Sequence, residues 1–150
     1  MEITSLRGDI TTMTEINASR EISAPLDKVW STISDVDSEP RYWRDLHAIY
    51  NISRNGNVIE REVTVGFRNS KSRQIVELHS KKSIEMTLTE GPIIGNRIIT
   101  LIPSNDETTK VNISWDVKLS GIPLLFRGIV RERIAEGTEE ALDRIARAVQ

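Results

Sequence analysis

The chain of 150 residues has no cysteine, two histidines and few aromatic residues. Without cysteine, it cannot form a disulfide scaffold, a thiol nucleophile, a CxxC redox site or a cysteine-ligated zinc module. With only His47 and His79 available, a histidine-rich metal site is not expected either. We therefore expect no metal and no cofactor.

Long apolar runs are also missing. No stretch approaches the ~18 consecutive apolar residues of a membrane-spanning helix. The N-terminus lacks the basic region followed by an apolar run that marks a signal peptide. These absences predict a cytoplasmic protein.

The composition is that of one globular domain. Hydrophobic residues make up 38% of the chain and charged residues 28%, which permits a packed core. The formal net charge of −2 argues against DNA binding through a positive field. Residues 1–13 are weakly patterned and are expected to form a tail or an extension of the first strand. Residues 14–150 contain no repeat or linker and are expected to form the domain.

Alternation of apolar and polar residues dominates most of this domain and predicts half-buried strands. The predicted strands cover residues 14–22, 48–52, 59–67, 74–78, 84–88, 97–101 and 111–119. Asn55-Gly56-Asn57 is a strong hairpin signal between two of them. A short helix is predicted from Pro25 to Ser34, and a second short helix or turn at residues 40–43. Consecutive strands with one polar face indicate an antiparallel meander.

The C-terminal segment changes to helical periodicity. Apolar or small residues recur at i, i+3 or i+4: Phe126, Val130, Ile134, Gly137, Ala141 and Ile145. A helix of more than twenty residues can bury this stripe only against the apolar face of the sheet. The predicted fold is therefore α+β: a curved antiparallel sheet of about seven strands around a long C-terminal helix, with two short helices after the first strand. A glycine on the buried side, such as Gly137, either permits close approach or leaves space for a cavity.

Several short motifs resemble one known family. They are residues 23–30 (Ser-Ala-Pro-Leu-Asp-Lys-Val-Trp) with Asp35, residues 40–43 (Pro-Arg-Tyr-Trp), residues 62–67, Gly91-Pro92 and residues 101–103. Together with the element order, they resemble the START-like proteins (SRPBCC superfamily, helix-grip fold). The similar branch contains polyketide cyclase/dehydrase-like proteins, coenzyme Q-binding proteins and the bacterial ribosome-association toxin. The resemblance implies a ligand cavity between sheet and helix, and leaves the ligand open because the superfamily also includes enzymes.

Strand parity selects the candidate ligand-binding residues. Arg61 and Arg97 share the apolar parity of their strands, so each either binds a ligand carbonyl, carboxylate or phosphate or extends to solvent. The aromatic and aliphatic candidates either line a cavity or only pack the core. The full set is Tyr50, Arg61, Val63, Val65, Phe67, Val76, Arg97, Ile99, Trp115, Phe126, Val130 and Ile134.

No catalytic residue is predicted. His47 and His79 have outward parity, and no nucleophile–base pair or phosphate-binding loop can be assigned. The leading hypothesis is binding or transport of a hydrophobic molecule that is lipid-, quinone- or polyketide-like. A cavity below about 100 Å³ would contradict it. The alternative is a cyclase or dehydratase that uses Arg61, Arg97 and Tyr50.

A third hypothesis concerns a basic cluster. Its members are Arg68, Lys71, Arg73, Lys81 and Lys82. The cluster either contacts a membrane surface or the ribosome, or is a solvated edge that discourages strand pairing. The sequence is compatible with a monomer or a homodimer.

Overall fold

The computed structural model describes residues 13–150, apart from the side chain of Phe67. The predicted N-terminal tail therefore lies almost wholly outside the described residues. The elements are β1 (Thr14–Ile22), α2 (Leu26–Ile33), η1 (Val36–Arg41), β2 (Leu46–Asn55), β3 (Val58–Val65), η2 (Phe67–Asn69), β4 (Ser70–His79), β5 (Ser83–Glu90), β6 (Ile94–Asn105), β7 (Thr108–Lys118), η3 (Leu124–Phe126) and α3 (Arg127–Val149). None of the helices within residues 13–150 combines the length and apolarity that a membrane crossing requires.

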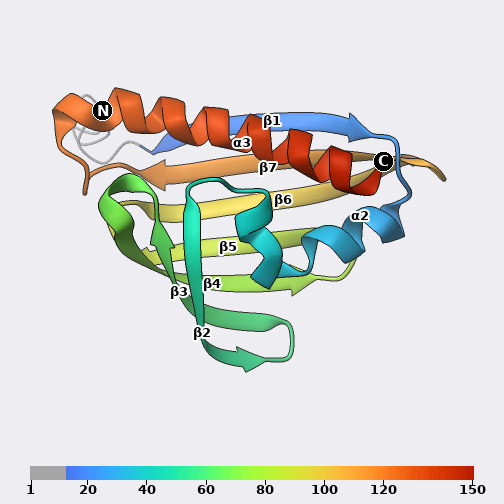
Figure 1. The fold of residues 1–150 in the computed structure, drawn as a ribbon, viewed down its shortest axis with the longest axis horizontal. Helices are drawn as coiled ribbons and strands as arrows, with labels where there is room; N and C mark the ends of the chain where they lie inside the picture. Colours follow the sequence, from blue (N-terminus) through green and yellow to red (C-terminus); the bar gives the residue numbers. More distant parts are fainter. Residues whose placement is uncertain (1–12) are drawn as a thin grey trace, which may run out of the picture.

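The seven strands form one antiparallel sheet in the order β1-β7-β6-β5-β4-β3-β2 (Figure 1). Strands β2 to β7 follow one another as a meander. β1 pairs with β7 at the far edge, so the helices α2 and η1 connect the two edges of the sheet. The predicted α+β fold with a seven-stranded sheet, two short helices and a long C-terminal helix is confirmed.

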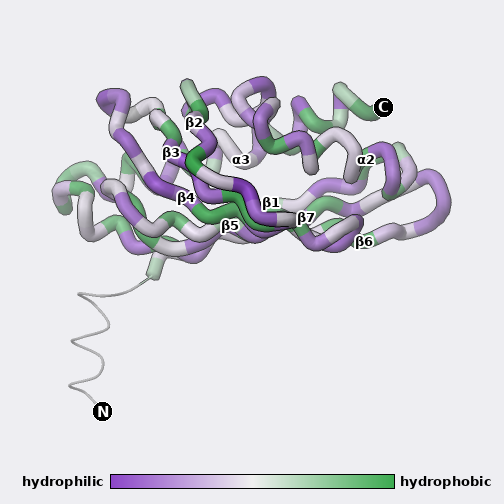
Figure 2. Tube along the Cα trace, turned by 90° about the horizontal axis from the view of Figure 1, so that it is seen from below, coloured by the Kyte–Doolittle hydropathy of each residue, from purple (hydrophilic) through white to green (hydrophobic). Residues whose placement is uncertain are grey.

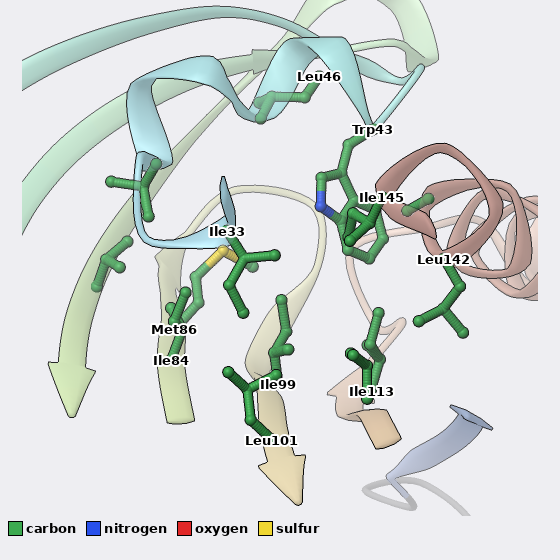
Figure 3. Packing of buried hydrophobic residues seen from close by; sticks show 14 of the residues in the cluster. Ile33, Trp43, Leu46, Ile84, Met86, Ile99, Leu101, Ile113, Leu142 and Ile145 are labelled. Carbon is green, nitrogen blue, oxygen red and sulfur yellow. The ribbon is translucent and has the colours of Figure 1, made fainter. Parts of the chain in front are cut away.

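The helices lie on one face of the sheet, and the β2–β3 end curves toward them (Figure 2). The apolar parity of β7 explains which face is covered, since Val111, Ile113 and Val117 are fully buried. On α3, Ala141 and Ile145 of the predicted stripe are buried against this face, together with Leu142 (Figure 3). The result is a two-layer molecule with its core between sheet and helix.

The inward parity of β2 differs from the prediction. The register shifts between Leu46 and Ala48, where β2 has an extra residue relative to β3. This bulge turns Ile49 toward the core and Tyr50 outward, so Tyr50 is 68% exposed. The prediction that Tyr50 points into the molecule is therefore wrong.

The end of β3 and the start of α3 also differ from the prediction. β3 ends at Val65, two residues before Phe67, because the chain turns through Arg68 and Asn69 at positive φ. Phe67 is therefore not on the strand, and its side chain is not among those that the structure describes. Phe126 belongs to the 3₁₀ turn η3 that precedes α3, and it is 40% exposed rather than part of the buried helix stripe.

Candidate functional site

A cavity of about 150 Å³ lies between the inner face of the sheet and the first half of α3. It exceeds the limit of about 100 Å³ below which the binding hypothesis would fail. Its wall is mostly apolar, with a few charged and polar groups. The lining residues are Trp43, Arg44, Asp45, Leu46, Arg61, Val65, Gly66, Ser72, Gln74, Met86, Leu88, Pro92, Ile93, Arg97, Trp115, Val130, Arg133, Ile134 and Gly137.

Gly137 is one reason why the space exists. It is buried in the middle of α3, yet a Cβ built on it would meet no atom within 4 Å apart from its chain neighbours and the backbone of its own helix. The glycine therefore leaves space rather than permitting close contact, the second of the two expectations for this position. Later in α3, Ala141, Leu142 and Ile145 pack fully against the core and leave no such gap.

A buried ion cluster forms the polar part of the site. Arg61 on β3 and Arg97 on β6 both donate to the carboxylate of Glu39, at 2.5 Å to Oε1 and 2.8 Å to Oε2 respectively. All three side chains are at least 95% buried. Two guanidinium groups and one carboxylate leave this cluster with a net charge of +1. The cluster joins η1 to two strands that are not neighbours in the sheet.

Electrostatics keep Glu39 ionised. Burial by itself would raise the pKa of this carboxyl group, but the charges of Arg97 and Arg61 and their hydrogen bonds outweigh it, so the pKa of Glu39 is lowered. Burial lowers the pKa of Arg97, and the nearby positive charge of Arg61 adds to this, whereas Glu39 opposes it. Glu39 is thus a fixed anion that accepts from two arginines and does not act as a proton donor.

The two arginines of the cluster differ in how many of their N–H donors already have an acceptor. Arg61 also donates through Nε to Gln74 at 2.9 Å and through Nη1 to the carbonyl of Val36 at 3.2 Å. Arg97 donates to Glu39, but its buried Nε has no partner among the described residues. A buried donor without an acceptor is costly, so Arg97 is the less completely satisfied of the two arginines.

Aromatic rings surround Arg97. Its guanidinium carbon lies 4.5 Å from the ring centroid of Trp43 and 5.6 Å from that of Trp115. The two indole rings meet edge to face, with centroids 5.9 Å apart and an interplanar angle of 77°. The Trp115 indole N–H is already donated to Thr138 on α3 at 2.9 Å. Trp115 therefore offers a ligand its ring surface and not its N–H group.

The partly exposed lining residues define the mouth of the cavity. Arg133 on α3 forms an ion pair with Asp45 at 2.8 Å across the opening. Arg44 lies beside them and pairs with Glu136 of α3 at 3.5 Å. These contacts are half-exposed, so each is weak and can exchange with water. They connect the η1–β2 segment to α3 without closing the cavity.

The structure brings half of the predicted ligand-binding residues to the cavity. These are Arg61, Val65, Arg97, Trp115, Val130 and Ile134. Val63, Val76 and Ile99 are buried in the core but do not line the cavity. Tyr50 and Phe126 are exposed, for the reasons given above. His47 and His79 lie away from the cavity, and His79 is near Glu85 on the outer face.

Sequence reasoning missed several members of the site. Met86 and Leu88 share the inward parity of their strand, so the same alternation could have identified them. Glu39 has no periodic signal because it lies in a 3₁₀ turn. The signal that could have pointed to such a residue is chemical: two inward arginines need a buried carboxylate. Which of the 22 acidic residues supplies it is decided by the fold.

The arrangement can bind an apolar body and one oxygen-bearing group. The described lining includes no histidine, lysine or tyrosine, so conventional proton-transfer groups are scarce there. Among residues 13–150, no three histidine or acidic side chains gather as a metal site. The chemistry of the wall therefore favours recognition of a carbonyl, enolate, phenolate or carboxylate by Arg97.

The chain is similar in sequence to one known protein family. Residues 13–150 match the family model described as "Polyketide cyclase / dehydrase and lipid transport". No curated protein matches the chain closely enough to count as a relative.

Solved structures share the fold at low sequence identity. The Zhui aromatase/cyclase of a Streptomyces species has a TM-score of 0.81 at 13% identity, covering 91% of this chain and 93% of that one. A Thermus thermophilus protein has a TM-score of 0.76 at 20% identity, covering 91% and 97%. A START superfamily protein from Mycobacterium smegmatis has a TM-score of 0.74 at 14% identity, covering 90% and 96%. At these identities the likeness concerns the fold.

Proposed function

Because the chain belongs to the polyketide cyclase/dehydrase and lipid transport family, we propose that it binds a lipid-, quinone- or polyketide-like hydrophobic molecule in the cavity between its sheet and α3. The observation that carries this proposal is Arg97. Its buried guanidinium lines the cavity beside two indole rings and, unlike that of Arg61, is not fully engaged by the described residues, so we expect it to bind a ligand oxygen on an otherwise mostly apolar wall.

The size of the cavity narrows the choice of ligand. A space of about 150 Å³ holds one benzene-sized ring. We infer that a ring with an oxygen substituent enters beside Trp43, Trp115 and Arg97, and that any apolar tail leaves through the mouth. A quinone-like or polyketide-like molecule fits this better than a lipid with two acyl chains.

Two contributions would provide affinity. Removing a ring from water is favourable by ~25 cal/mol per Å² of apolar surface buried. A charge-assisted hydrogen bond from Arg97 to a ligand oxygen contributes roughly 1.5–3 kcal/mol and sets the orientation. Glu39 already holds the guanidinium in place, so little further ordering is needed on binding.

The experiment has two steps. Native mass spectrometry and solvent extraction of the purified protein first ask whether a hydrophobic molecule co-purifies. Titration with a short-chain benzoquinone then follows quenching of the tryptophan fluorescence, to which Trp43 and Trp115 on the cavity wall contribute together with Trp30. Arg97→Met should weaken quinone binding about tenfold or more, and should leave binding of toluene, a ring without oxygen, nearly unchanged.

Gly137→Leu places a side chain in the cavity and should abolish binding of both probes. Gly128→Leu is the matched control, because Gly128 is also on α3 with open space around its Cβ position but does not line the cavity. Equal affinities of these two variants for the quinone would contradict the proposal.

The same arginine supports a second candidate, a cyclase. A buried guanidinium can stabilise the enolate oxygen that forms when a water molecule takes an α-proton from the substrate. The enolate carbon then attacks a ketone within the same chain, and the resulting alkoxide takes that proton back from the hydronium ion. This candidate ranks second because Asp45, a carboxylate on the cavity wall, is paired with Arg133, and Tyr50 is on the surface. Cyclisation of a linear triketone, followed by absorbance, should accelerate over buffer and lose the acceleration in Arg97→Met. No acceleration by the unmodified protein removes the candidate.

A further inference from the structure

Four large apolar side chains lie exposed together in one short segment. Leu124 and Leu125 in η3 are 78% and 84% exposed, and Ile129 in the first turn of α3 is 60% exposed. With Phe126 they form what we call the η3 patch. The two leucines are the most exposed large apolar side chains among residues 13–150. Contiguous exposed apolar side chains of this kind mark an interaction surface.

The charges next to the η3 patch are mostly positive, with Glu132 as the acidic residue in the same part of α3. Arg127 and Arg131 lie one turn apart at the start of α3. Within residues 13–150, both guanidinium groups bond to backbone carbonyl oxygens, of Ile122 and Glu15, and pair with no carboxylate. The chain as a whole has a net charge of −2, so the positive charge at the start of α3 is opposite in sign to that of the whole chain. Leucines flanked by unneutralised arginines complement a surface with an apolar interior and anionic groups above it.

The basic cluster predicted from the sequence lacks this property. Lys71 pairs with Glu62, Arg73 with Glu60 and Lys81 with Asp27, at 3.9, 3.4 and 3.0 Å. These carboxylates reduce its positive field, and the exposed apolar residue within it, Ile75, is 37% exposed, against 78% and 84% for Leu124 and Leu125. A membrane contact, which the sequence suggested for that cluster, is better placed at the η3 patch.

The η3 patch adjoins the mouth of the cavity. α3 continues from the patch directly into Val130 and Arg133, both of which line the cavity. The loop before η3 packs at Gly121 against Pro92, so closely that a Cβ on Gly121 would lie 2.4 Å from the Pro92 carbonyl oxygen. Pro92 also lines the cavity. The end of β7, the start of α3 and the β5–β6 turn meet at this end of the molecule (Figure 1).

The size of the patch distinguishes between two occupants. Four such side chains present on the order of 500 Å² of apolar surface, whereas a stable dimer buries about 800 Å² on each partner. Arginines on both copies would also face each other across a symmetric contact. An anionic lipid surface accepts both the leucines and the arginines.

We propose that the η3 patch inserts into the interface of an anionic lipid bilayer and brings the mouth of the cavity against the membrane. A hydrophobic ligand then passes between bilayer and cavity without crossing water. The membrane contact stands on the patch alone, and its use for ligand exchange rests on the proposed function.

The test is co-sedimentation of the full chain with vesicles of phosphatidylcholine, with and without phosphatidylglycerol. Binding is expected only with the anionic lipid, and should weaken as salt is raised. The double variant Leu124→Ser/Leu125→Ser should bind at least tenfold more weakly. Ile52→Ser/Ile102→Ser, which changes two exposed isoleucines elsewhere on the sheet, should bind like the unmodified protein.

Two further measurements identify the contact. The fluorescence of Leu125→Trp should shift to the blue when anionic vesicles are added, since the indole enters the bilayer. Quinone affinity in free solution should be the same in the Leu124→Ser/Leu125→Ser variant, which separates failure of this proposal from failure of the proposed function. The proposal is overturned if the unmodified protein does not bind anionic vesicles. It is also overturned if light scattering shows a dimer that the double serine variant dissociates, because the patch would then join two copies.

Discussion

The two halves of α3 face the same sheet in different ways. Ile134 and Ile145 are eleven residues, about three turns, apart on one side of the helix. Ile145 is 1% exposed and surrounded by core, whereas Ile134 is half-buried and borders the cavity. Around Ile145, the small residues Ala141 and Ala146 let the helix approach the sheet closely. Around Ile134, Gly137 leaves a gap.

The difference between the two halves of α3 separates the part of the helix that stabilises the core from the part that borders the binding cavity. The C-terminal half of α3 packs against aliphatic side chains and closes, because such side chains interdigitate to high density. The first half faces a wall that contains the Glu39–Arg61–Arg97 cluster and two indole rings. A hydrogen-bonded ion cluster keeps its geometry and does not collapse into a void. One helix thus contributes to the core at one end and to a binding cavity at the other.

The largest expected effect comes from the ion cluster. Glu39→Gln removes the anion and leaves Arg61 and Arg97 buried together without a counter-charge, so the free energy of unfolding should fall by about 3–5 kcal/mol. Urea denaturation followed by circular dichroism measures it. Glu140→Gln is the control: Glu140 also lies between two arginines, but about a third of its side chain is exposed, so its loss should be below about 1 kcal/mol.

The pH dependence of the stability of the unmodified protein and of Glu39→Gln tests whether the lost charge causes the destabilisation. Because the pKa of Glu39 is lowered on folding, its stabilising contribution is present above the pKa of the unfolded chain, about 4.3, and is lost as the pH falls through the lower folded value. The stability difference between the unmodified protein and Glu39→Gln should be largest above about pH 5 and shrink in more acid solution. A difference that does not change with pH would mean that lost packing, and not lost charge, is responsible.

The comparison between the two halves of α3 is tested by matched truncations. Ile145→Ala should lower the free energy of unfolding by about 2–5 kcal/mol, since it opens a hole in a closed core. Ile134→Ala should cost less than about 1.5 kcal/mol, because its side chain is already partly solvated and borders empty space. Thermal and chemical denaturation of both variants measure the two losses. Equal losses would remove the distinction between a closed and an open half.

The smallest expected effect comes from the helix glycines. Gly137→Ala should raise the free energy of unfolding by up to ~1 kcal/mol, since alanine favours the helix and its methyl group has room. Gly128→Ala, in the first turn of α3, should raise it by less. Only Gly137→Ala should also change the affinity for the benzoquinone probe. A destabilised Gly137→Ala would show that the space seen beside this residue is occupied in solution.

Alternation and helical periodicity predicted most of the architecture. The parity of residues 111–119 and the stripe on α3 identified the buried faces, because burial of one face imposes a period of two on a strand and 3.6 on a helix. The side-chain pairs Glu140–Arg144 and Asp143–Arg147 are formed on the exposed side of α3, as four-residue spacing predicts. Tyr50 was misplaced because a single extra residue in β2 reverses the parity after it.

The sequence by itself determined which strands and helix form, which faces are apolar, and that two arginines share the apolar parity of their strands. The tertiary structure decided that both arginines meet at Glu39, that Arg97 lines the cavity with an Nε that donates to none of residues 13–150, and that Leu124 and Leu125 are exposed near its mouth. The physical reason is the distance along the chain between the residues that interact. Periodic patterns arise from neighbours within a few residues of each other, whereas a cavity and an ion cluster depend on distances between segments far apart in the chain.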